Sequence, residues 1–421
     1  MKKTIKRIFL GILFVLIAGV VVYYPKLKTV WMTLSFFEED VIVDHFTGMN
    51  KIWHSSEVEK SSQPFYFPKA AELEWPQSIS YGGEEYDARA FLDSSHTTGF
   101  LVIHDDSLRF EQYYRGHSES TRHISWSVAK SYVSALFGMA LADGDIKSIE
   151  QKVEEYLPEL KGSGYEGVRI KDVLQMSTGV RFNEDYGDLS SDINRWGRSF
   201  AWGSSQDKFA ASLVREREPG TYNHYVSINT HVLGMILVKA TGKSLTEYLH
   251  EKLWEPLGCE FNAYWLRDDY EMEMALGGLN VCLRDYAKIG QLFLHDGNWQ
   301  GKQIVPKAWV KASVAPDAPH LMPGKNEQSA HQGFGYGFQW WVPDGDEGEF
   351  MAMGVYNQYI YVNPTTGTVI VKNSANPHYN DKSYIWSRAS SHLELFRAIA
   401  RGLEAKSESK SEEEPVSQTP S

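Results

Sequence analysis

The chain has 421 residues, of which 42% are hydrophobic and 13% aromatic, so it can form one large domain or two modest ones around a substantial core. The formal net charge is −12, which argues against a nucleic-acid partner because phosphate binding requires clustered Lys and Arg side chains. The cysteines Cys259 and Cys282 cannot form a disulfide framework or a cysteine-rich zinc site. They can still pair with each other, although we expect them to be free and structural.

An apolar run from Ile8 to Tyr24 follows four Lys and Arg residues at the N-terminus. This length is short for a membrane span and long for the apolar part of a signal peptide. No cleavage pattern of small residues follows the run, so an uncleaved anchor is favoured over a secretory signal. The charges disfavour a buried core helix. They predict a cytoplasmic N-terminus and a membrane-anchored, extracytoplasmic remainder at the periplasm or cell surface.

Residues 26–86 contain scattered prolines and a Gly-Gly pair, which predicts a tether that wraps the main domain. Apolar and alternating residues then predict a hairpin with strands at 99–104 and 108–114. A buried helix begins near Ser127 and stops at Asp143-Gly144, because its apolar residues recur at helical spacing up to that glycine.

Two short helices are predicted at 153–158 and 170–176, and longer ones at 229–241 and 283–295. Between the predicted helices at 170–176 and 229–241, residues 181–205 form a long polar segment that carries Tyr186 and two tryptophans. Segments of this length without regular structure are usually binding lids or disordered. The aromatic side chains favour a lid.

The C-terminal part predicts strands at 349–353, 358–362 and 369–372, followed by a helix at 386–401. Residues 404–421 are rich in Ser, Glu and Lys and lack aromatic residues. We therefore expect this tail to be disordered.

The S-x-x-K pattern of Ser127 and Lys130 places a hydroxyl and an amine on one face of a helix. Such a pair can act as nucleophile and base when the lysine is desolvated. The spacing also occurs at Ser205/Lys208 and Ser407/Lys410, but only Ser127 opens an apolar helix. A helix-start serine without catalytic function explains this motif alone equally well.

Other catalytic patterns are missing from the sequence. It contains no G-x-S-x-G, which excludes the nucleophile-elbow hydrolases. The segment 241–244 lacks the earlier glycine of a phosphate-binding loop and is expected to be a helix end. The histidines form neither H-E-x-x-H nor H-x-H, so we expect no catalytic zinc and no cofactor.

Four motifs in order resemble the class C β-lactamase-like serine hydrolases, a β-lactamase/transpeptidase-like family. They are Ile124-Ser-Trp-Ser-Val-Ala-Lys-Ser131, Asp172-Val-Leu-Gln-Met-Ser-Thr-Gly179, Tyr225-Val-Ser227, and Gly277-Gly-Leu-Asn280 before Arg284-Asp285. The nearest branch is that of the 6-aminohexanoate-dimer hydrolases and esterase-like members. The resemblance extends from about residue 97 to 401.

The resemblance implies an α+β fold, in which an antiparallel sheet flanked by helices is formed by early and late segments and carries an inserted all-helical domain. We therefore expect a membrane anchor helix or signal segment at 1–25 and a tether at 26–86. The hydrolase domain would cover 87–403, with its helical subdomain at about 146–275. The disordered tail at 404–421 would complete the chain.

By motif matching, the resemblance implies that Ser127 is the nucleophile, Lys130 its general base and Tyr225 a second acid/base group. The sequence does not determine which of Lys130 and Tyr225 takes the proton first. The backbone N–H groups of Ser127 and Val355 would form the oxyanion hole. We expect the substrate to contact the side chains or backbone of Tyr186, Ser227, Asn280 and Gly354.

Two positions depart from the family pattern. Ser227 stands where many relatives have Asn, which removes an amide that can both donate and accept. The family's Lys-Thr-Gly element is replaced by Ala352-Met-Gly354, which removes the cation that recognises the carboxylate of a β-lactam. Another cation, such as Arg388 or Lys372, could replace it.

The sequence thus predicts a membrane-anchored serine hydrolase that cleaves a small amide or ester through an acyl-enzyme on Ser127. One alternative is a D-Ala carboxypeptidase or true β-lactamase. Another is a catalytically silent, membrane-anchored binding domain. The oligomeric state is not predicted.

Overall fold

A seven-stranded antiparallel sheet is the central element of this computed structural model, which describes residues 2–381 and 383–413. Its strand order is β11-β12-β13-β14-β15-β4-β5. The early hairpin pairs with the last of the late strands, with Ile103 opposite Val369. The strands are β4 (Thr97–His104), β5 (Ser107–Tyr113), β11 (Phe334–Tyr336), β12 (Trp341–Pro343), β13 (Phe350–Gly354), β14 (Gln358–Asn363) and β15 (Thr368–Ser374).

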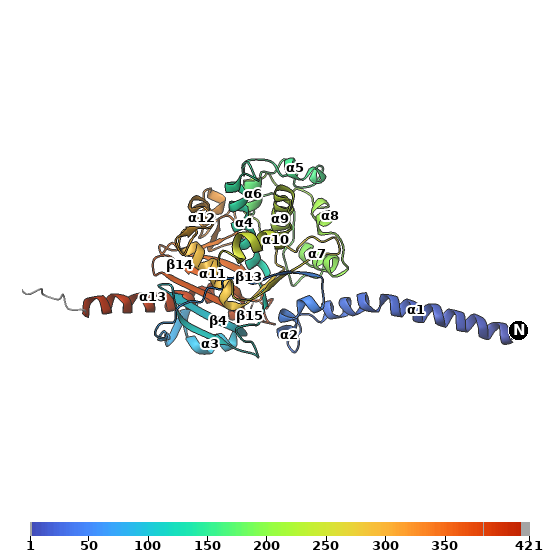
Figure 1. Cartoon of the computed structure of the whole chain (residues 1–421), viewed down its shortest axis with the longest axis horizontal. Helices are drawn as coiled ribbons and strands as arrows, with labels where there is room; N and C mark the ends of the chain where they lie inside the picture. Colours follow the sequence, from blue (N-terminus) through green and yellow to red (C-terminus); the bar gives the residue numbers. More distant parts are fainter. Residues whose placement is uncertain (1, 382, 414–421) are drawn as a thin grey trace, which may run out of the picture.

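Both faces of this sheet are covered, and every residue of β4 is buried. Successive side chains of a strand point to opposite faces, so Leu101 joins one hydrophobic cluster and Val102 the other. Helices α4 (Ala129–Asp143) and α11 (Leu283–Leu294) belong to the first cluster. Helices α3 (Ala88–Ser94) and α13 (Ala389–Glu413) belong to the second. The layers are visible in Figure 1.

The described elements between residues 129 and 254 are all helical and lie together beside the sheet (Figure 1). Two long helices, α4 and α9, pack against each other at the centre of this group. Helix α9 covers Ser227–Thr241, and the other helices are α5 (Val153–Tyr156), α6 (Ile170–Leu174), α7 (Asp192–Ala201), α8 (Gln206–Ala211) and α10 (Leu245–Leu249). Helix α7 lies inside the segment predicted to be an irregular lid, because its apolar residues Ile193, Trp196 and Phe200 recur at helical spacing and are buried.

A second sheet of four strands has the order β1-β7-β8-β6. Its strands are β1 (Ser55–Val58), β6 (His123–Ile124), β7 (Ala263–Leu266) and β8 (Leu279–Val281). Strand β1 belongs to the segment 26–86, which is therefore partly regular. Strand β7 lies near the end of the range 146–275, so the part of that range after about residue 262 is not helical as predicted. The pairing of β1 with β7 accounts for both differences, because it adds the N-terminal extension to the sheet.

Several smaller elements complete the fold. They are α2 (Ile42–Thr47), α12 (Lys307–Ser313), the hairpin of β2 (Ser78–Tyr81) and β3 (Glu84–Asp87), and the short pair β9 (Asn298–Trp299) and β10 (Lys302–Gln303). The two cysteines are buried and free, as expected.

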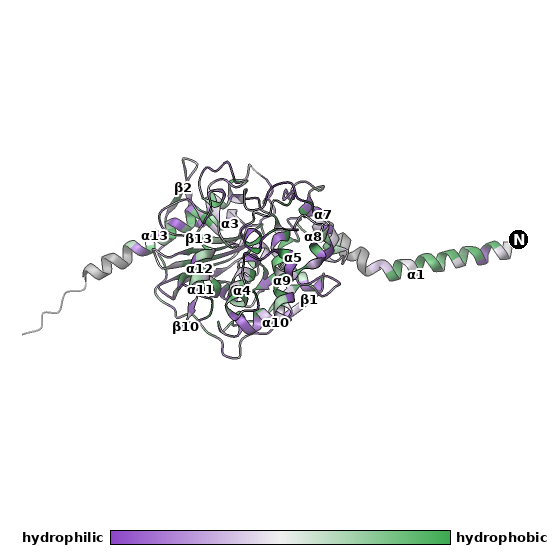
Figure 2. Ribbon diagram, turned by 90° about the horizontal axis from the view of Figure 1, so that it is seen from above, coloured by the Kyte–Doolittle hydropathy of each residue, from purple (hydrophilic) through white to green (hydrophobic). Residues whose placement is uncertain are grey.

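Helix α1 (Lys2–Leu34) projects from the domain on the side opposite to α13 (Figures 1 and 2). Its stretch Thr4–Tyr24 is long and apolar enough to cross a membrane, and none of it is buried against protein. The helix continues past the predicted boundary at residue 25. A signal sequence has the same length and composition, so its retention in the mature protein stays a prediction.

Helix α13 continues past residue 403 to Glu413, into the segment predicted to be disordered. Six of the ten residues 404–413 are Glu or Lys, which are good helix formers, and a helix already seeded in the core extends readily. The rest of the predicted tail, 414–421, lies outside the described residues.

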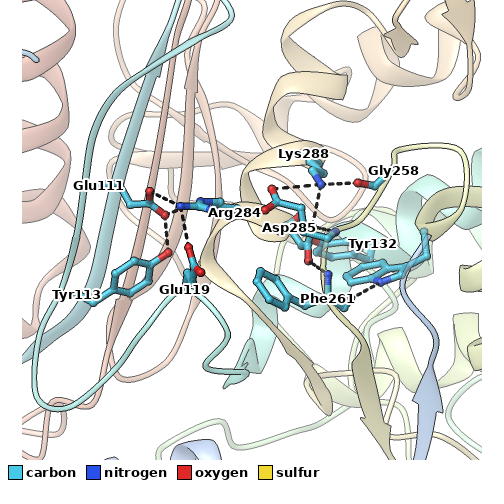
Figure 3. A network of polar contacts seen from close by, with 11 residues as sticks. Glu111, Tyr113, Glu119, Tyr132, Gly258, Phe261, Arg284, Asp285 and Lys288 are labelled. Atoms are coloured by element: carbon cyan, nitrogen blue, oxygen red, sulfur yellow. Dashed lines mark hydrogen bonds and ion pairs between the residues drawn. The ribbon is translucent and has the colours of Figure 1, made fainter. Parts of the chain in front are cut away.

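The start of α11 is joined to its surroundings by buried polar contacts (Figure 3). The Asp285 carboxylate accepts from the backbone N–H groups of Glu260 and Phe261 at 2.8 and 3.0 Å. Lys288 donates to Asp285 at 2.9 Å and to the Gly258 carbonyl at 2.6 Å. Both charged side chains are fully buried, so each depends on the opposite charge of the other to offset its loss of hydration.

Arg284 extends this network to the large sheet (Figure 3). Its guanidinium contacts both carboxylate oxygens of Glu111 on β5, at 2.7 and 2.8 Å. It also contacts Glu260 and Glu119 at 3.2 and 3.1 Å. The Arg284-Asp285 pair of the family motif therefore connects the sheet, α11 and the loop before β7.

We predict that Asp285→Ala lowers the free energy of unfolding by about 3–5 kcal/mol, because it leaves a buried lysine without its counter-charge. Urea unfolding followed by circular dichroism measures this loss. The control is Glu251→Ala, which removes a surface partner of Lys243 and is expected to cost less than about 1 kcal/mol. Equal losses in both variants would contradict the structural importance of the network.

Candidate active site

Ser127 lies on a 3-10 turn, η2 (Trp126–Val128), between β6 and α4. Trp126 has a φ of +44°, which is uncommon for a bulky residue. A Cβ atom at Gly277 would lie 3.3 Å from the carbonyl carbon of Trp126. The glycine pair of the family motif therefore lets the chain approach the turn that carries Ser127.

Lys130 lies in the first turn of α4 and is almost fully buried, with 1% of its side chain exposed. Its Nζ donates to the Ser127 Oγ at 2.9 Å and to the Leu276 carbonyl at 2.5 Å. Burial lowers the pKa of Lys130 to about 7, although the charge of Glu184 acts in the opposite direction. A substantial fraction of Lys130 is therefore neutral at physiological pH and can accept a proton.

Tyr225 precedes α9, and its side chain lines the same cavity as Ser127. Its ring centroid lies 5.3 Å from the Lys130 Nζ. The ring stacks on Trp341 at 5.4 Å. Burial raises the pKa of Tyr225 well above its ordinary value, so the hydroxyl stays protonated and available as a donor.

Glu184 is a site residue that the sequence analysis did not identify. Its carboxylate accepts from the Ser227 hydroxyl at 2.5 Å, the Ser227 N–H at 3.1 Å and the Tyr186 hydroxyl at 2.9 Å. Burial raises the pKa of Glu184, while Lys130 and Ser227 lower it. Its position two residues before Tyr186, in a segment already predicted to cover the site, was the available signal.

Two cavities meet at Ser127, Tyr186 and Val355, which line both. The Tyr225 cavity has a volume of about 360 Å³, and its side chains with polar groups include Glu184, Tyr225, His331 and Tyr379. The Phe36 cavity has a volume of about 280 Å³ and is lined mainly by aromatic and aliphatic side chains. Ser127 thus stands between a polar space and an apolar one.

Gly354 ends strand β13 next to the turn that carries Ser127. A Cβ atom at this position would lie 2.6 Å from the carbonyl oxygen of Ser125, so a larger residue would separate the strand from the turn. Gly354 lines the Tyr225 cavity, and the following residue, Val355, lines both cavities.

The structure does not bring every predicted residue to the cavities. Asn280 is buried on β8, where its amide donates to the Gly278 carbonyl at 2.9 Å, and it lines neither cavity. Ser227 is also fully buried, and it is linked to the Tyr225 cavity through Glu184. Ala352 is buried in the core, whereas its neighbour Met353 lines the Tyr225 cavity.

The proposed replacement cations are not among the residues that line either cavity. Lys372 is fully buried, with its Nζ 3.5 Å from the Ser95 carbonyl, and Arg388 is not part of either wall. Burial lowers the pKa of His331 to about 4, so it is neutral at pH 7. Among the described residues, Glu184 is therefore the ionisable carboxylate of the Tyr225 cavity, and no Lys or Arg side chain lines it.

Within the described part of the chain, no three His, Cys, Asp or Glu side chains gather in a way that could hold a metal ion. The chemistry available at the site is that of a serine hydroxyl, a largely desolvated amine, a phenol and a carboxyl group.

Comparison with known proteins places this geometry in a family. The beta-lactamase family model matches residues 88–390. The 6-aminohexanoate-dimer hydrolase of Paenarthrobacter ureafaciens is 30% identical over 320 residues, which cover 74% of this chain and 81% of the relative.

Solved structures agree with this match. A protein from Bacillus anthracis, described as a 6-aminohexanoate-dimer hydrolase, superimposes with a TM-score of 0.77 at 25% identity, covering 88% of this chain and 96% of its own. EstCE1, a hydrolase with promiscuous acyltransferase activity, shares the fold, with a TM-score of 0.58 at 14% identity over 75% of this chain and 96% of its own. The chain therefore belongs to the beta-lactamase family, and it is a hydrolase of the amidase and esterase type.

Proposed function

We propose that this protein hydrolyses a small amide or ester through an acyl-enzyme formed on Ser127. The observation that carries the proposal is the contact of 2.9 Å between the Ser127 Oγ and a buried Lys130 whose pKa is about 7. A neutral amine at this distance can remove the hydroxyl proton as the oxygen attacks.

In the acylation step, the Ser127 Oγ forms a bond to the substrate carbonyl carbon while its proton passes to Lys130. The resulting oxyanion would accept hydrogen bonds from the N–H groups of Ser127 and Val355. Collapse of this intermediate breaks the bond to the leaving amine or alcohol. The hydroxyl of Tyr225 would donate a proton to that leaving atom and regain it from Lys130.

In the second step, a water molecule attacks the acyl-enzyme. Its proton passes to the Lys130 and Tyr225 pair, the bond between the Ser127 Oγ and the acyl carbon breaks, and Oγ regains a proton. The product is the free acid, and the enzyme returns to its starting state. Amides and esters without an anionic group fit the Tyr225 cavity best, because its lining offers a carboxyl group and no Lys or Arg among the described residues.

The relative from Paenarthrobacter ureafaciens is named as a hydrolase of a 6-aminohexanoate dimer, which supports an amide or ester substrate here. A D-Ala carboxypeptidase or β-lactamase would need a cation for the substrate carboxylate, which the described lining of the Tyr225 cavity does not provide. We also propose that α1 anchors the protein and that its catalytic domain is extracytoplasmic. The unburied apolar stretch and the preceding positive charges support this arrangement.

We predict that Ser127→Ala lowers kcat/KM for a p-nitrophenyl ester by roughly 10⁴-fold or more, because a catalytic unit loses most of its rate with its nucleophile. The variant should also lose labelling by a fluorophosphonate probe. The matched control is Ser205→Ala, which removes the serine of a second S-x-x-K pattern. Ser205 only caps α8, so this variant should keep the activity. Labelling of the Ser127→Ala variant would place the nucleophile elsewhere.

We predict that kcat/KM falls as the pH is lowered through about 7, because protonation of Lys130 removes the base. Lys130→Arg should abolish activity, since arginine cannot give up its proton. Glu184→Gln should move this acidic limb to lower pH, because the Glu184 charge raises the pKa of Lys130. Rates measured from pH 5 to 9 that stay flat would contradict the base function of Lys130.

We predict that nitrocefin, which carries a carboxylate, is turned over at least ten- to a hundred-fold less efficiently than p-nitrophenyl butanoate. This factor corresponds to a missing charge-assisted hydrogen bond of about 1.5–3 kcal/mol. Met353→Lys would place a cation in the Tyr225 cavity and should raise the ratio of nitrocefin to ester kcat/KM, whereas Met353→Gln should not. Efficient nitrocefin turnover by the wild type would favour a β-lactamase.

A further inference from the structure

The Phe36 cavity differs from the Tyr225 cavity in the chemistry of its walls. Residues that contribute apolar surface include Phe36, Trp53, Trp126, Ile193, Trp196 and Met274. Arg198 is its charged lining residue among those the structure describes, and its guanidinium donates to the Leu189 carbonyl at 2.8 Å. The volume of about 280 Å³ is close to the lower end of ligand sites, roughly 300 Å³.

This apolar wall is assembled from distant parts of the chain. Phe36 and Phe37 directly follow α1, Ile193 and Trp196 come from α7, and Met274 precedes the glycine pair. An open apolar space lined by aromatic side chains is poorly hydrated, so it gains most from an apolar ligand. Because Ser127 forms part of the same wall, a ligand there is also within reach of the nucleophile.

The position of Tyr225 decides which half of the substrate enters this space. Tyr225 lines the cavity that bears its name and not the Phe36 cavity. The group that protonates the leaving atom must lie beside that atom, so the leaving amine or alcohol faces the Tyr225 cavity. The acyl half, on the other side of the reacting carbonyl, then points into the Phe36 cavity.

We infer that the Phe36 cavity binds an aliphatic acyl chain, so that the substrates are amphiphilic esters or amides of medium-chain or longer fatty acids. This inference rests on the proposed function and names its substrate class. The cavity mouth includes Leu189, which is 78% exposed, and Phe37, which is 41% exposed. A chain longer than the cavity can extend past them.

The test is a series of p-nitrophenyl esters with the full chain in lipid nanodiscs. Each buried methylene contributes a factor of about four to kcat/KM when its transfer is fully realised. The octanoyl ester should therefore exceed the butanoyl ester by at least about tenfold. The series is measured with esters dissolved in buffer and with esters dissolved in the disc lipid. If the octanoyl ester is preferred in buffer, the substrate class is a soluble amphiphile. If it is preferred only in the disc lipid, the substrate class is a membrane-resident amphiphile.

Gly197→Phe tests the location of the chain. Gly197 lies on α7 and lines the Phe36 cavity, and a Cβ atom there would meet nothing within 4 Å. The new ring should fill the cavity without a backbone clash and lower the octanoyl-to-butanoyl ratio by about tenfold or more. The matched control is Gly402→Phe, at an exposed position of α13 that also has open space. It should keep the wild-type ratio.

Leu189→Gln serves as a second variant that does not touch the core, because the side chain is largely exposed. It should lower the octanoyl rate by several-fold. A wild-type ratio near one in both arms, or an unchanged ratio in folded Gly197→Phe, would overturn the inference. If either of these results is found while hydrolysis of the butanoyl ester still depends on Ser127, the proposed function stands and only the acyl-chain inference fails. Absence of any Ser127-dependent hydrolysis would instead contradict the proposed function itself.

Discussion

The burial of an amine beside the Ser127 hydroxyl is the constraint on which the rest of this site depends. Lys130 is almost wholly removed from water, and the loss of hydration makes its charged form unfavourable enough to bring its pKa to about 7. A buried amine must still satisfy its hydrogen-bonding capacity. The Leu276 carbonyl and the Ser127 hydroxyl do so, and this requirement connects α4 to the segment before β8.

The carboxyl group of Glu184 adjusts this balance. Its charge favours protonated Lys130, while burial favours the neutral amine, and burial is the larger influence. Glu184 accepts its hydrogen bonds from Ser227 and Tyr186, which hold it in place on the cavity wall. The serine that replaces the family's usual asparagine thus orients a carboxyl group that the motif alone does not reveal.

The site also depends on close backbone contacts that exclude side chains. Gly354 lets the end of β13 approach the Ser125 carbonyl, and Gly277 lets its segment approach Trp126. Two cavities of different polarity then remain on either side of Ser127. The two cavities differ in polarity because different residues line them. Tyr225 and Glu184 line the Tyr225 cavity, and the aromatic residues that follow α1 line the Phe36 cavity.

Local sequence patterns determined the main secondary elements and the central motif, whereas the fold class was implied by the resemblance of four motifs to a known family. Alternating and helical periodicities predicted the hairpin of β4 and β5, the late strands, and the helices α4, α9 and α11, because each pattern reflects neighbours a few residues apart. The S-x-x-K of Ser127 and Lys130 was likewise readable, since its two residues share one helical turn. The apolar N-terminal stretch and its preceding positive charges were evident from composition alone, and the structure shows that this stretch is not buried.

Only the tertiary structure decided how distant segments meet. Glu184 and Ser227 lie far apart in the sequence, and their contact follows from the packing of the segment before α7 against the start of α9. Pairing of β8 with β6 and β7 buries Asn280 away from the cavities, and the orientation of β13 in the sheet puts Met353, not Ala352, at the wall. Periodicity specifies which face of an element is apolar but not which other element covers it. The partners of Lys130 and the lining of the two cavities therefore follow from chain topology and side-chain packing.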